Sequence, residues 1–577
     1  MNKALASVFI LSALAPLVPA CSSEESSSNT GGTGGTGGTG GSAAPTTGGT
    51  STGGVNVNGG SPTTPTGGVA PTATGGVAPT TSGGGTPSAA GAASGGVAGN
   101  PPVVTGGAPA AGAGGSAPVA GAGGASAGAS GSGGGSGGAA PSVCKVPEGA
   151  PTAQLITFND NGGWCWYQDE RVIVDTKNNR MIVGSMSGTG GRAGNVEAVV
   201  WDLTTKTGKN TVLNKLSTDD HNTVAFTLTG SGDVAAMWAT HRENCNSYFA
   251  TLDAAGTWSK TSTYSWSGDG CPWAGASTNM ITYANPWLMA SENNRLYSGV
   301  RSVETSPAFL TSTDNGKSWG FHGRLTSSPQ QGYVAGYYKY WGNGTDRIDW
   351  VGTDAHPRDA DNSLWHGYIQ GGKVYGTDGT VIDDTFGDKT AQNINKYTQV
   401  FKTGSTVGSV KLEHMWNHDI VRYADGSIVI LGQGRVTGTG ADDPDKRHVY
   451  SRWDGKTWTT TYLAKSGTKL YNDEQDYTGL SAADPDDPTV IYISTPFDPR
   501  DDSSMSANRK REIWRGTTCD NGKTFTWTPI TQNSTQDNIR PVVPKWDAAH
   551  TAVLWMQGSY TTAQNYNMKI VGLVMER

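Results

Sequence analysis

Two histidines, a tyrosine and an arginine stand at spacings that bring them together at one end of two predicted β-hairpins. His221 and His241 lie equally far before and after the middle of "GSGD", which is typical of a hairpin turn. Antiparallel pairing around that turn sets the two imidazoles side by side. In the next hairpin, "ITYANPWLMASENNRLYSGVRS", the central turn places Tyr283 roughly across from Arg301. We therefore expect the four side chains to form one catalytic group.

This set of side chains suits β-elimination from a uronic acid better than hydrolysis. The proton next to a uronate carboxylate is weakly acidic until the carboxylate charge is neutralised, which Arg301 and one histidine can do. A neutral imidazole or a tyrosinate can then remove the proton, and a tyrosine hydroxyl can protonate the departing glycosidic oxygen. Glycoside hydrolysis normally needs two carboxyl groups at a fixed separation. Asp219, Asp220 and Glu243 are nearby, but hairpin geometry singles out none of them.

Further basic residues stand near the ends of other predicted hairpins. They would give a protein of net charge −7 a locally basic mouth. The alternative, that each one satisfies loop carbonyl groups, is the better interpretation of any one of them taken alone. The predicted substrate-binding residues are Arg171, His356, His418, Arg435 and Arg540.

The elements that must position these residues are short β-strands. From residue 146 to residue 577, short alternating runs are broken by Gly, Asn and Asp, and there is no long amphipathic helical stripe. Seven hairpin turns can be placed near residues 178, 231, 293, 345, 425, 486 and 548. Their separations of 52 to 80 residues suit a four-stranded blade with its loops. The sequence therefore predicts an all-β fold, a seven-bladed β-propeller.

A second repeated pattern supports the same architecture. "STDNGKSW" matches the Asp-box pattern S-x-D-x-G-x-x-W, and "TCDNGKTF" is a close variant of it. "WDGKTW" and "LDAAGTW" are degraded copies. Asp boxes form the turn between the outer two strands of a blade, so we interpret these segments as structural.

Four segments, "NDNGGWCWYQDERVIV", "DDHNTVAF", "ITYANPWLMASENNRLYSGVR" and "DAHPRDADNSLWHGYI", together resemble the BNR-repeat-containing propeller family. That family includes the seven-bladed ulvan lyases, a group of polysaccharide lyases. The resemblance implies that His221 and Tyr283 form the acid/base pair and that His241 and Arg301 handle the substrate carboxylate. It leaves open which of His221 and Tyr283 removes the proton. The expected partner is an anionic, uronate-containing polysaccharide.

Two other functions remain as alternatives. A sialidase-like hydrolase shares propellers and Asp boxes, and Arg171, Arg301 and Arg540 could mimic its arginine triad. However, "DERVIV" stands where sialidases carry "FRIP", and the paired histidines would have no role. The second alternative is a non-catalytic carbohydrate-binding propeller displayed on the cell surface, because a fold alone does not settle function.

The elimination chemistry requires no cofactor. Some relatives hold a structural metal ion, so a structural Ca²⁺ or Zn²⁺ stays open, with His356, His366 and His418 as conceivable ligands. Their spacing is not that of a compact zinc motif, and the identity of any metal is unknown. We expect no nucleic-acid partner, because the net charge is −7, and we expect a monomer.

The first 142 residues predict export and tethering. Residues 1–20 are typical of a lipoprotein signal peptide, and "VPAC" predicts lipidation of Cys21. Residues 21–142 are mostly Gly, Thr, Ala, Ser and Pro, a composition typical of a disordered linker. We therefore expect a protein anchored by lipid to the cell envelope, or else secreted, with its catalytic domain in residues 146–577. Five further cysteines leave at least one thiol unpaired, and Cys165 is expected to be an inert buried thiol.

Overall fold

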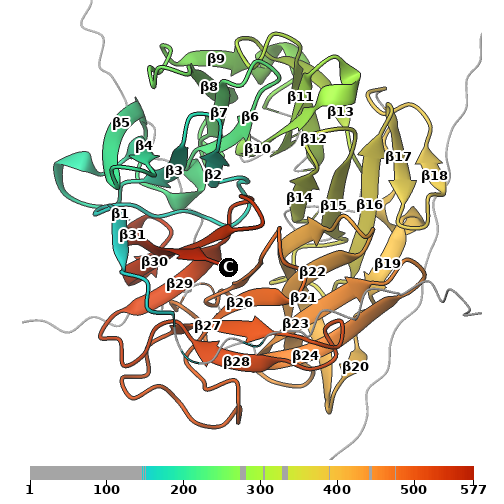
Figure 1. Ribbon diagram of the computed structural model, residues 1–577. Helices are drawn as coiled ribbons and strands as arrows, with labels where there is room; N and C mark the ends of the chain where they lie inside the picture. Colours follow the sequence, from blue (N-terminus) through green and yellow to red (C-terminus); the bar gives the residue numbers. More distant parts are fainter. Residues whose placement is uncertain are drawn as a thin grey trace, which may run out of the picture. The chain divides into compact units, whose positions relative to one another are not determined.

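Seven antiparallel sheets stand around a central axis in the computed structural model (Figure 1). The structure describes residues 146, 149, 151–272, 281–302, 306–327, 336–388, 390–440, 445–472, 474 and 476–577. The predicted signal peptide, Cys21 and the predicted linker lie outside the described residues. Each sheet is one blade of four to six strands, and the predicted seven-bladed all-β propeller is confirmed.

The first four blades follow one another along the chain. Blade 1 contains β2 (Val172–Asp175), β3 (Arg180–Met186), β4 (Asn195–Asp202) and β5 (Thr207–Lys215). Blade 2 contains β6 (Ala225–Leu228), β7 (Val234–Ala239), β8 (Asn246–Leu252) and β9 (Ser262–Ser265). Blade 3 contains β10 (Thr282–Met289), β11 (Arg295–Arg301), β12 (Pro307–Ser312) and β13 (Gly320–Arg324). Blade 4 contains β14 (Tyr338–Gly342), β15 (Ile348–Thr353), β16 (Leu364–Gln370), β17 (Lys373–Gly376), β18 (Val381–Asp383) and β19 (Thr398–Phe401).

The last three blades complete the ring. Blade 5 contains β20 (Ser405–Val407), β21 (Val410–Arg422), β22 (Ile428–Val436), β23 (Lys446–Trp453) and β24 (Trp458–Gly467). Blade 6 contains β25 (Ser481–Ala483), β26 (Val490–Thr495), β27 (Glu512–Thr517) and β28 (Thr526–Pro529). Blade 7 contains β29 (Asp537–Val542), β30 (His550–Thr562), β31 (Asn565–Glu576) and β1 (Ile156–Asn159). The short 3₁₀ helices are η1 (Gly190–Arg192), η2 (Asp220–Asn222), η3 (Trp266–Asp269), η4 (Ala290–Glu292) and η6 (Ile394–Lys396).

The ring is closed by pairing between its first and last strands. Strand β1 pairs antiparallel with β31, with Ile156 opposite Gly572 (Figure 1). Blade 7 therefore takes its outermost strand from the beginning of the domain. This pairing covers a sheet edge that would otherwise be exposed.

The predicted turns connect the first two strands of each blade, when blade 5 is counted from β21. In blade 2, Ala225 pairs with Met237 and Leu228 pairs with Val234, so the hairpin is centred on residue 231 as predicted. Blade 3 differs from the prediction by one residue. A bulge there makes Thr282 the partner of Arg301, and Tyr283 takes a positive φ of 72° within the bulge.

The two best Asp-box matches form turns between the third and fourth strands of their blades. The Asp314 carboxylate, between β12 and β13, accepts hydrogen bonds from the backbone N–H groups of Lys317 and Ser318. In blade 6, the Asp520 carboxylate accepts the two equivalent backbone hydrogen bonds between β27 and β28. Both carboxylates are used by their own turns, which agrees with a structural role.

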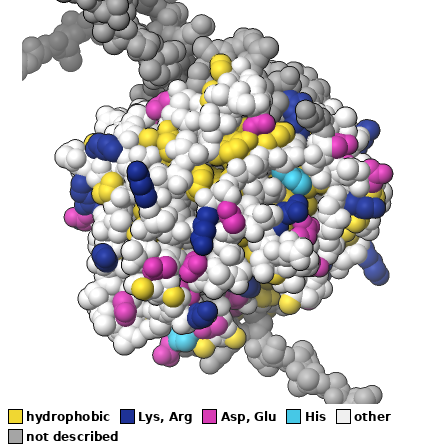
Figure 2. Space-filling view, turned by 90° about the horizontal axis from the view of Figure 1, so that it is seen from above, with side chains coloured by type: hydrophobic (Ala, Val, Ile, Leu, Met, Phe, Trp, Pro, Cys, Tyr) yellow, Lys and Arg dark blue, Asp and Glu magenta, His cyan; other side chains and the backbone are white. Residues whose placement is uncertain are grey.

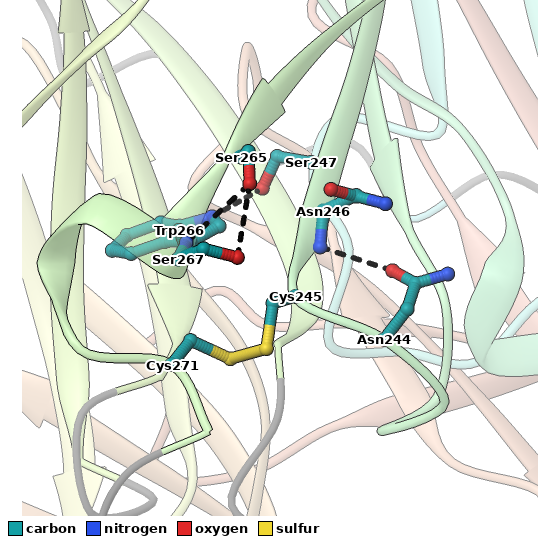
Figure 3. The surroundings of a disulfide bond; sticks show 8 residues. All are labelled: Asn244, Cys245, Asn246, Ser247, Ser265, Trp266, Ser267 and Cys271. Carbon is teal, nitrogen blue, oxygen red and sulfur yellow. Dashed lines mark hydrogen bonds between the residues drawn. A yellow bond between two sulfur atoms is a disulfide. The ribbon is translucent and has the colours of Figure 1, made fainter.

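One disulfide ties down the segment that follows the second strand of blade 2. Cys245 precedes β8 and is bonded to Cys271, which follows η3 (Figure 3). Beside it, the Trp266 indole donates a hydrogen bond to Ser247 Oγ. A covalent loop with a separation of 26 residues stabilises a fold by about 3–4 kcal/mol. No disulfide is predicted from the sequence, whereas the prediction that Cys165 is a free, buried thiol is confirmed.

The surface carries charges of both signs. Figure 2 shows one side of the molecule, on which Lys and Arg side chains are interspersed with Asp and Glu. A mixed surface of this kind has no single-sign field over the whole face. None of the helices in the described part of the chain has the length and apolar composition to cross a membrane.

Candidate active site

The four residues of the predicted catalytic group meet at one end of blades 2 and 3. His221 belongs to η2, directly before β6, and His241 follows the end of β7. Tyr283 stands near the start of β10, and Arg301 ends β11. The start of a blade's first strand and the end of its second strand lie at the same end of an antiparallel hairpin. The topology therefore brings all four to one rim of the propeller.

The two imidazoles are stacked and share one carboxylate. Their ring centroids are 3.9 Å apart, with an interplanar angle of 12°. His221 Nδ1 lies 2.7 Å from Asp219 Oδ1, and His241 Nδ1 lies 2.9 Å from Asp219 Oδ2. Because an ionised carboxylate only accepts hydrogen bonds, each Nδ1 carries a proton. The Nε2 atom of a neutral imidazole at this site is then the one that can accept a proton.

Asp219 remains an anion despite its burial. Burial opposes its ionisation, but His241 and His221 hold the pKa of the carboxyl well below its ordinary value. Its position follows from local structure, because Asp219 caps η2 by accepting a hydrogen bond from the His221 backbone N–H. The same carboxylate therefore orders the backbone of the site and orients both histidines.

Asp220 is held by an arginine from the last blade. Its Oδ1 lies 2.8 Å from His221 Nδ1, and its Oδ2 accepts hydrogen bonds from Arg540 and from the Tyr560 hydroxyl. Arg540 also donates to the Trp164 carbonyl oxygen and is only 1% exposed. This position does not favour the prediction that Arg540 binds substrate, because the buried guanidinium is already engaged in an ion pair. Arg540 instead supports the site by holding Asp220.

The two groups of the acid/base pair both have raised pKa values. Burial favours neutral His221, but the Cys165 sulfur and the Asp219 carboxylate raise the pKa of His221 well above its ordinary value. Burial raises the pKa of the Tyr283 hydroxyl well above 10, although Arg301 opposes that shift. His221 is therefore a stronger base that must lose a proton before it acts, and Tyr283 stays protonated at neutral pH.

The Tyr283 ring packs against both His221 and Arg301. Its centroid is 5.7 Å from that of His221, and the Arg301 guanidinium carbon is 4.8 Å from it in a cation–π contact. Within the described residues the buried Tyr283 hydroxyl has no hydrogen-bond partner. An unpartnered buried hydroxyl costs roughly 1–3 kcal/mol. The group is therefore available to a ligand that can accept its proton.

A pocket open to solvent lies over the histidine pair, and Tyr283 and Arg301 line a neighbouring pocket that shares Tyr337 with it. The predicted residue His356 reaches the pocket over the histidines from the loop after β15, with its Nε2 3.3 Å from the Tyr337 hydroxyl. Burial, together with Arg358, lowers the pKa of His356 to about 3, so this imidazole is neutral. Sequence reasoning missed several lining residues, which come from loops of blades 4 to 7: Tyr337, Arg358, Tyr471, Glu474, Tyr477 and Gln564.

The structure separates three other predicted substrate-binding residues from this pocket. Arg171 and His418 line a different pocket, which borders β21, β25 and β29. Arg435 is buried and donates to both carboxylate oxygens of Asp476 at 2.8 Å. The structure therefore does not bring these residues to one shared basic mouth. Two register shifts in β21 change which side chains of blade 5 face the rim, and sequence offsets alone do not reveal them.

The histidines named as conceivable metal ligands do not form one cluster. His366 Nε2 lies 3.2 Å from Asp349, and His418 Nδ1 lies 2.9 Å from Ser481 Oγ. Among the described residues, three other groups have ligand atoms within 4.8 Å of one another. They are Cys165 with Asp220 and His221, Asp219 with His221 and His241, and Asp361 with Glu413 and His414.

Comparisons with known proteins concern the fold alone. No protein-family model matches the chain, and no curated protein matches it. A solved polysaccharide lyase of family PL25, an ulvan lyase bound to -[GlcA(1-4)Rha3S]-, is 13% identical with a TM-score of 0.49, covering 72% of this chain and 95% of that chain. The NanB sialidase from Streptococcus pneumoniae is 12% identical with a TM-score of 0.34, covering 72% and 70%. The GH93 arabinofuranosidase of Fusarium graminearum is 9% identical with a TM-score of 0.34, covering 61% and 92%.

Proposed function

We propose that this protein is a polysaccharide lyase that cleaves a uronate-containing, ulvan-like polymer by β-elimination. The observation that carries the proposal is the meeting of two Asp219-bound histidines with the Tyr283 hydroxyl, which has no partner among the described residues and lies next to Arg301. These groups supply a base, an acid and positive charge for the substrate carboxylate. The proposal includes export and anchoring at the cell envelope, as residues 1–21 predict.

In the proposed reaction His221 is the base. Asp219 holds the Nδ1 proton, so neutral His221 presents the Nε2 lone pair to the proton next to the uronate carboxylate. Arg301 and His241 neutralise that carboxylate and stabilise the enolate-like charge as it forms. The electron pair of the broken C–H bond becomes the new carbon–carbon double bond, and the glycosidic C–O bond breaks.

Tyr283 is the proposed acid. Its pKa is raised by burial, so the protonated hydroxyl can give its proton to the departing glycosidic oxygen. In the alternative reaction Tyr283 also removes the first proton, which requires a tyrosinate. Burial disfavours that anion, whereas the basic form of His221 is the neutral imidazole, which burial favours. This comparison favours His221 as the base.

The geometry disfavours the sialidase-like alternative. That reaction needs three arginines around one carboxylate. Arg171, however, lines the pocket that borders β21, β25 and β29, and Arg540 is buried against Asp220. Of the three candidates, Arg301 alone lies beside the Tyr283 ring. A hydrolase would also leave the two oriented histidines without a function.

The first test is a product assay on the full chain with a panel of uronate polysaccharides. We expect ultraviolet absorbance from the unsaturated uronate, which only elimination produces, together with new reducing ends. The His221→Ala variant, purified in the same way, controls for a contaminating lyase. New reducing ends without absorbance would make the protein a hydrolase, and binding without either signal would make it a lectin.

The pH dependence follows from the raised pKa of His221. A base must be neutral to accept a proton, so kcat/KM should rise with pH through a value above the ordinary imidazole pKa of about 6.5. In the Asp219→Asn variant one anionic neighbour is lost, so the rising limb should move to lower pH while kcat falls about 10²-fold. Profiles of kcat/KM against pH for both proteins measure this. A rate that falls as the pH rises past neutrality would assign the base to another group.

A further inference from the structure

Side chains that can bind a metal ion come together from two blades beside the proposed active site. The loop between β15 and β16 brings His356 and Arg358 to the pocket and then passes the beginning of β21. Where they meet, Asn362 donates a hydrogen bond to the Met415 carbonyl oxygen at 2.7 Å. In the same place, three ligating side chains come together: Asp361 of the loop with Glu413 and His414 of β21.

The possible ligand atoms of this group lie close to one another. His414 Nε2 lies 2.9 Å from Asp361 Oδ1, and ligand atoms of all three residues lie within 4.8 Å of one another. Two ligand atoms that each stand about 2.1 Å from a tetrahedrally coordinated ion are about 3.4 Å apart. The Asp361 side chain is 56% exposed, so water can complete the coordination shell.

A hydrogen bond from outside the group orients the His414 ring. His414 Nδ1 bonds the Pro357 carbonyl oxygen, and a carbonyl only accepts, so Nδ1 carries the proton. Nε2 of His414, the ring atom left to bind a ligand, faces the Asp361 carboxylate oxygen at 2.9 Å. The nearby Glu413 carboxylate gives a metal ion a third ligand. A backbone carbonyl that fixes Nδ1–H is also how metal-binding histidines are usually oriented.

We propose that Asp361, Glu413 and His414 bind one divalent transition-metal ion of the Zn²⁺ class, at a site distinct from the histidine pair. Imidazole selects zinc-like ions, because Ca²⁺ prefers an all-oxygen shell. The ion joins the loop after β15 to β21 and so fixes the segment that carries His356 and Arg358. This consequence for activity rests on the proposed lyase function, whereas the binding of the ion does not.

The test is Zn²⁺ titration of the chelator-treated full chain by calorimetry, without substrate. We expect one site whose affinity falls at least 10-fold in Asp361→Asn and in Glu413→Gln. Asp384→Asn, which removes an exposed carboxylate elsewhere in blade 4, is the matched control and should bind as the parent does. A large excess of Ca²⁺ should not displace the ion, and displacement would overturn its assignment to the Zn²⁺ class.

Thermal unfolding gives a second readout that needs no activity. Saturating Zn²⁺ should raise the Tm of the parent and of Asp384→Asn, but not that of Asp361→Asn. Absence of Zn²⁺ binding in the parent, or binding that is equal in Asp361→Asn and the parent, would overturn the proposal. On a polymer that the parent cleaves, loss of the ion should raise KM more than it lowers kcat. A chain that binds Zn²⁺ as expected but cleaves no polymer would refute the lyase function and leave the metal site standing.

Discussion

The His221→Ala variant is expected to lose about 10³–10⁴-fold in kcat on the polymer that the parent cleaves. The imidazole is the proposed base, and Cys165 and Asp219 raise its pKa against the effect of burial. Its removal leaves water to abstract a weakly acidic proton. KM should change little, because Arg301 and His241 still meet the carboxylate. Initial rates from unsaturated-uronate absorbance measure both constants.

Two controls separate the loss of a base from damage to the fold. His550→Gln removes an imidazole that is 46% exposed at the start of β30, and it should leave the rate unchanged. Added imidazole should restore part of the activity of His221→Ala, because the substitution leaves a space the size of an imidazole beside the pocket that His221 lines. A His221→Ala protein with an unchanged Tm and near-parental kcat would exclude His221 as the base.

The architecture could be predicted because its signals are local. Each turn sits between two alternating strands, and a period of two residues fixes which side chains share a face. The blade 2 hairpin is centred on residue 231, so equal offsets on its two sides brought His221 and His241 to one end. The two rings stack at a centroid distance of 3.9 Å, in agreement with that pairing.

The surroundings of the site could not be predicted in the same way. Arg540 and Asp220 are 320 positions apart, and no sequence period relates them. The role of Asp219 depends on the short helix η2, which interrupts the approach to β6 and turns one carboxylate toward two rings. The "DDH" segment could have indicated this role of Asp219, because an aspartate directly before a helical turn is a common N-cap.

Irregular strands limit what sequence offsets can say about the rest of the rim. In blade 3 a bulge moves Tyr283 by one position, yet its ring still reaches His221 and Arg301. In β21 two register shifts occur within a few residues, and His418 faces a different pocket. A bulge changes the face to which every later side chain points. Predictions made by counting residues from a turn therefore hold only up to the first bulge in the strand.

The Tyr283→Phe variant is expected to lose about 10²–10⁴-fold in kcat without any loss of stability. Phenylalanine keeps the ring that packs on Arg301 and removes the hydroxyl that has no partner among the described residues. The free energy of unfolding should therefore stay the same or rise by about 1 kcal/mol, because a buried polar group without a partner is lost. Steady-state kinetics and thermal unfolding measure the two effects, with Tyr375→Phe on the outer strand β17 as the matched control.

A substrate with a good leaving group distinguishes the acid from the base. An aryl uronide whose leaving oxygen needs no protonation should be cleaved by Tyr283→Phe almost as fast as by the parent. The same substrate should not rescue His221→Ala, because the proton next to the carboxylate must still be removed. If both variants stay equally slow on it, Tyr283 takes part in proton abstraction. If Tyr283→Phe is as fast as the parent on the natural polymer, the hydroxyl has no role in the reaction, and the leaving oxygen takes its proton from another group in the pocket.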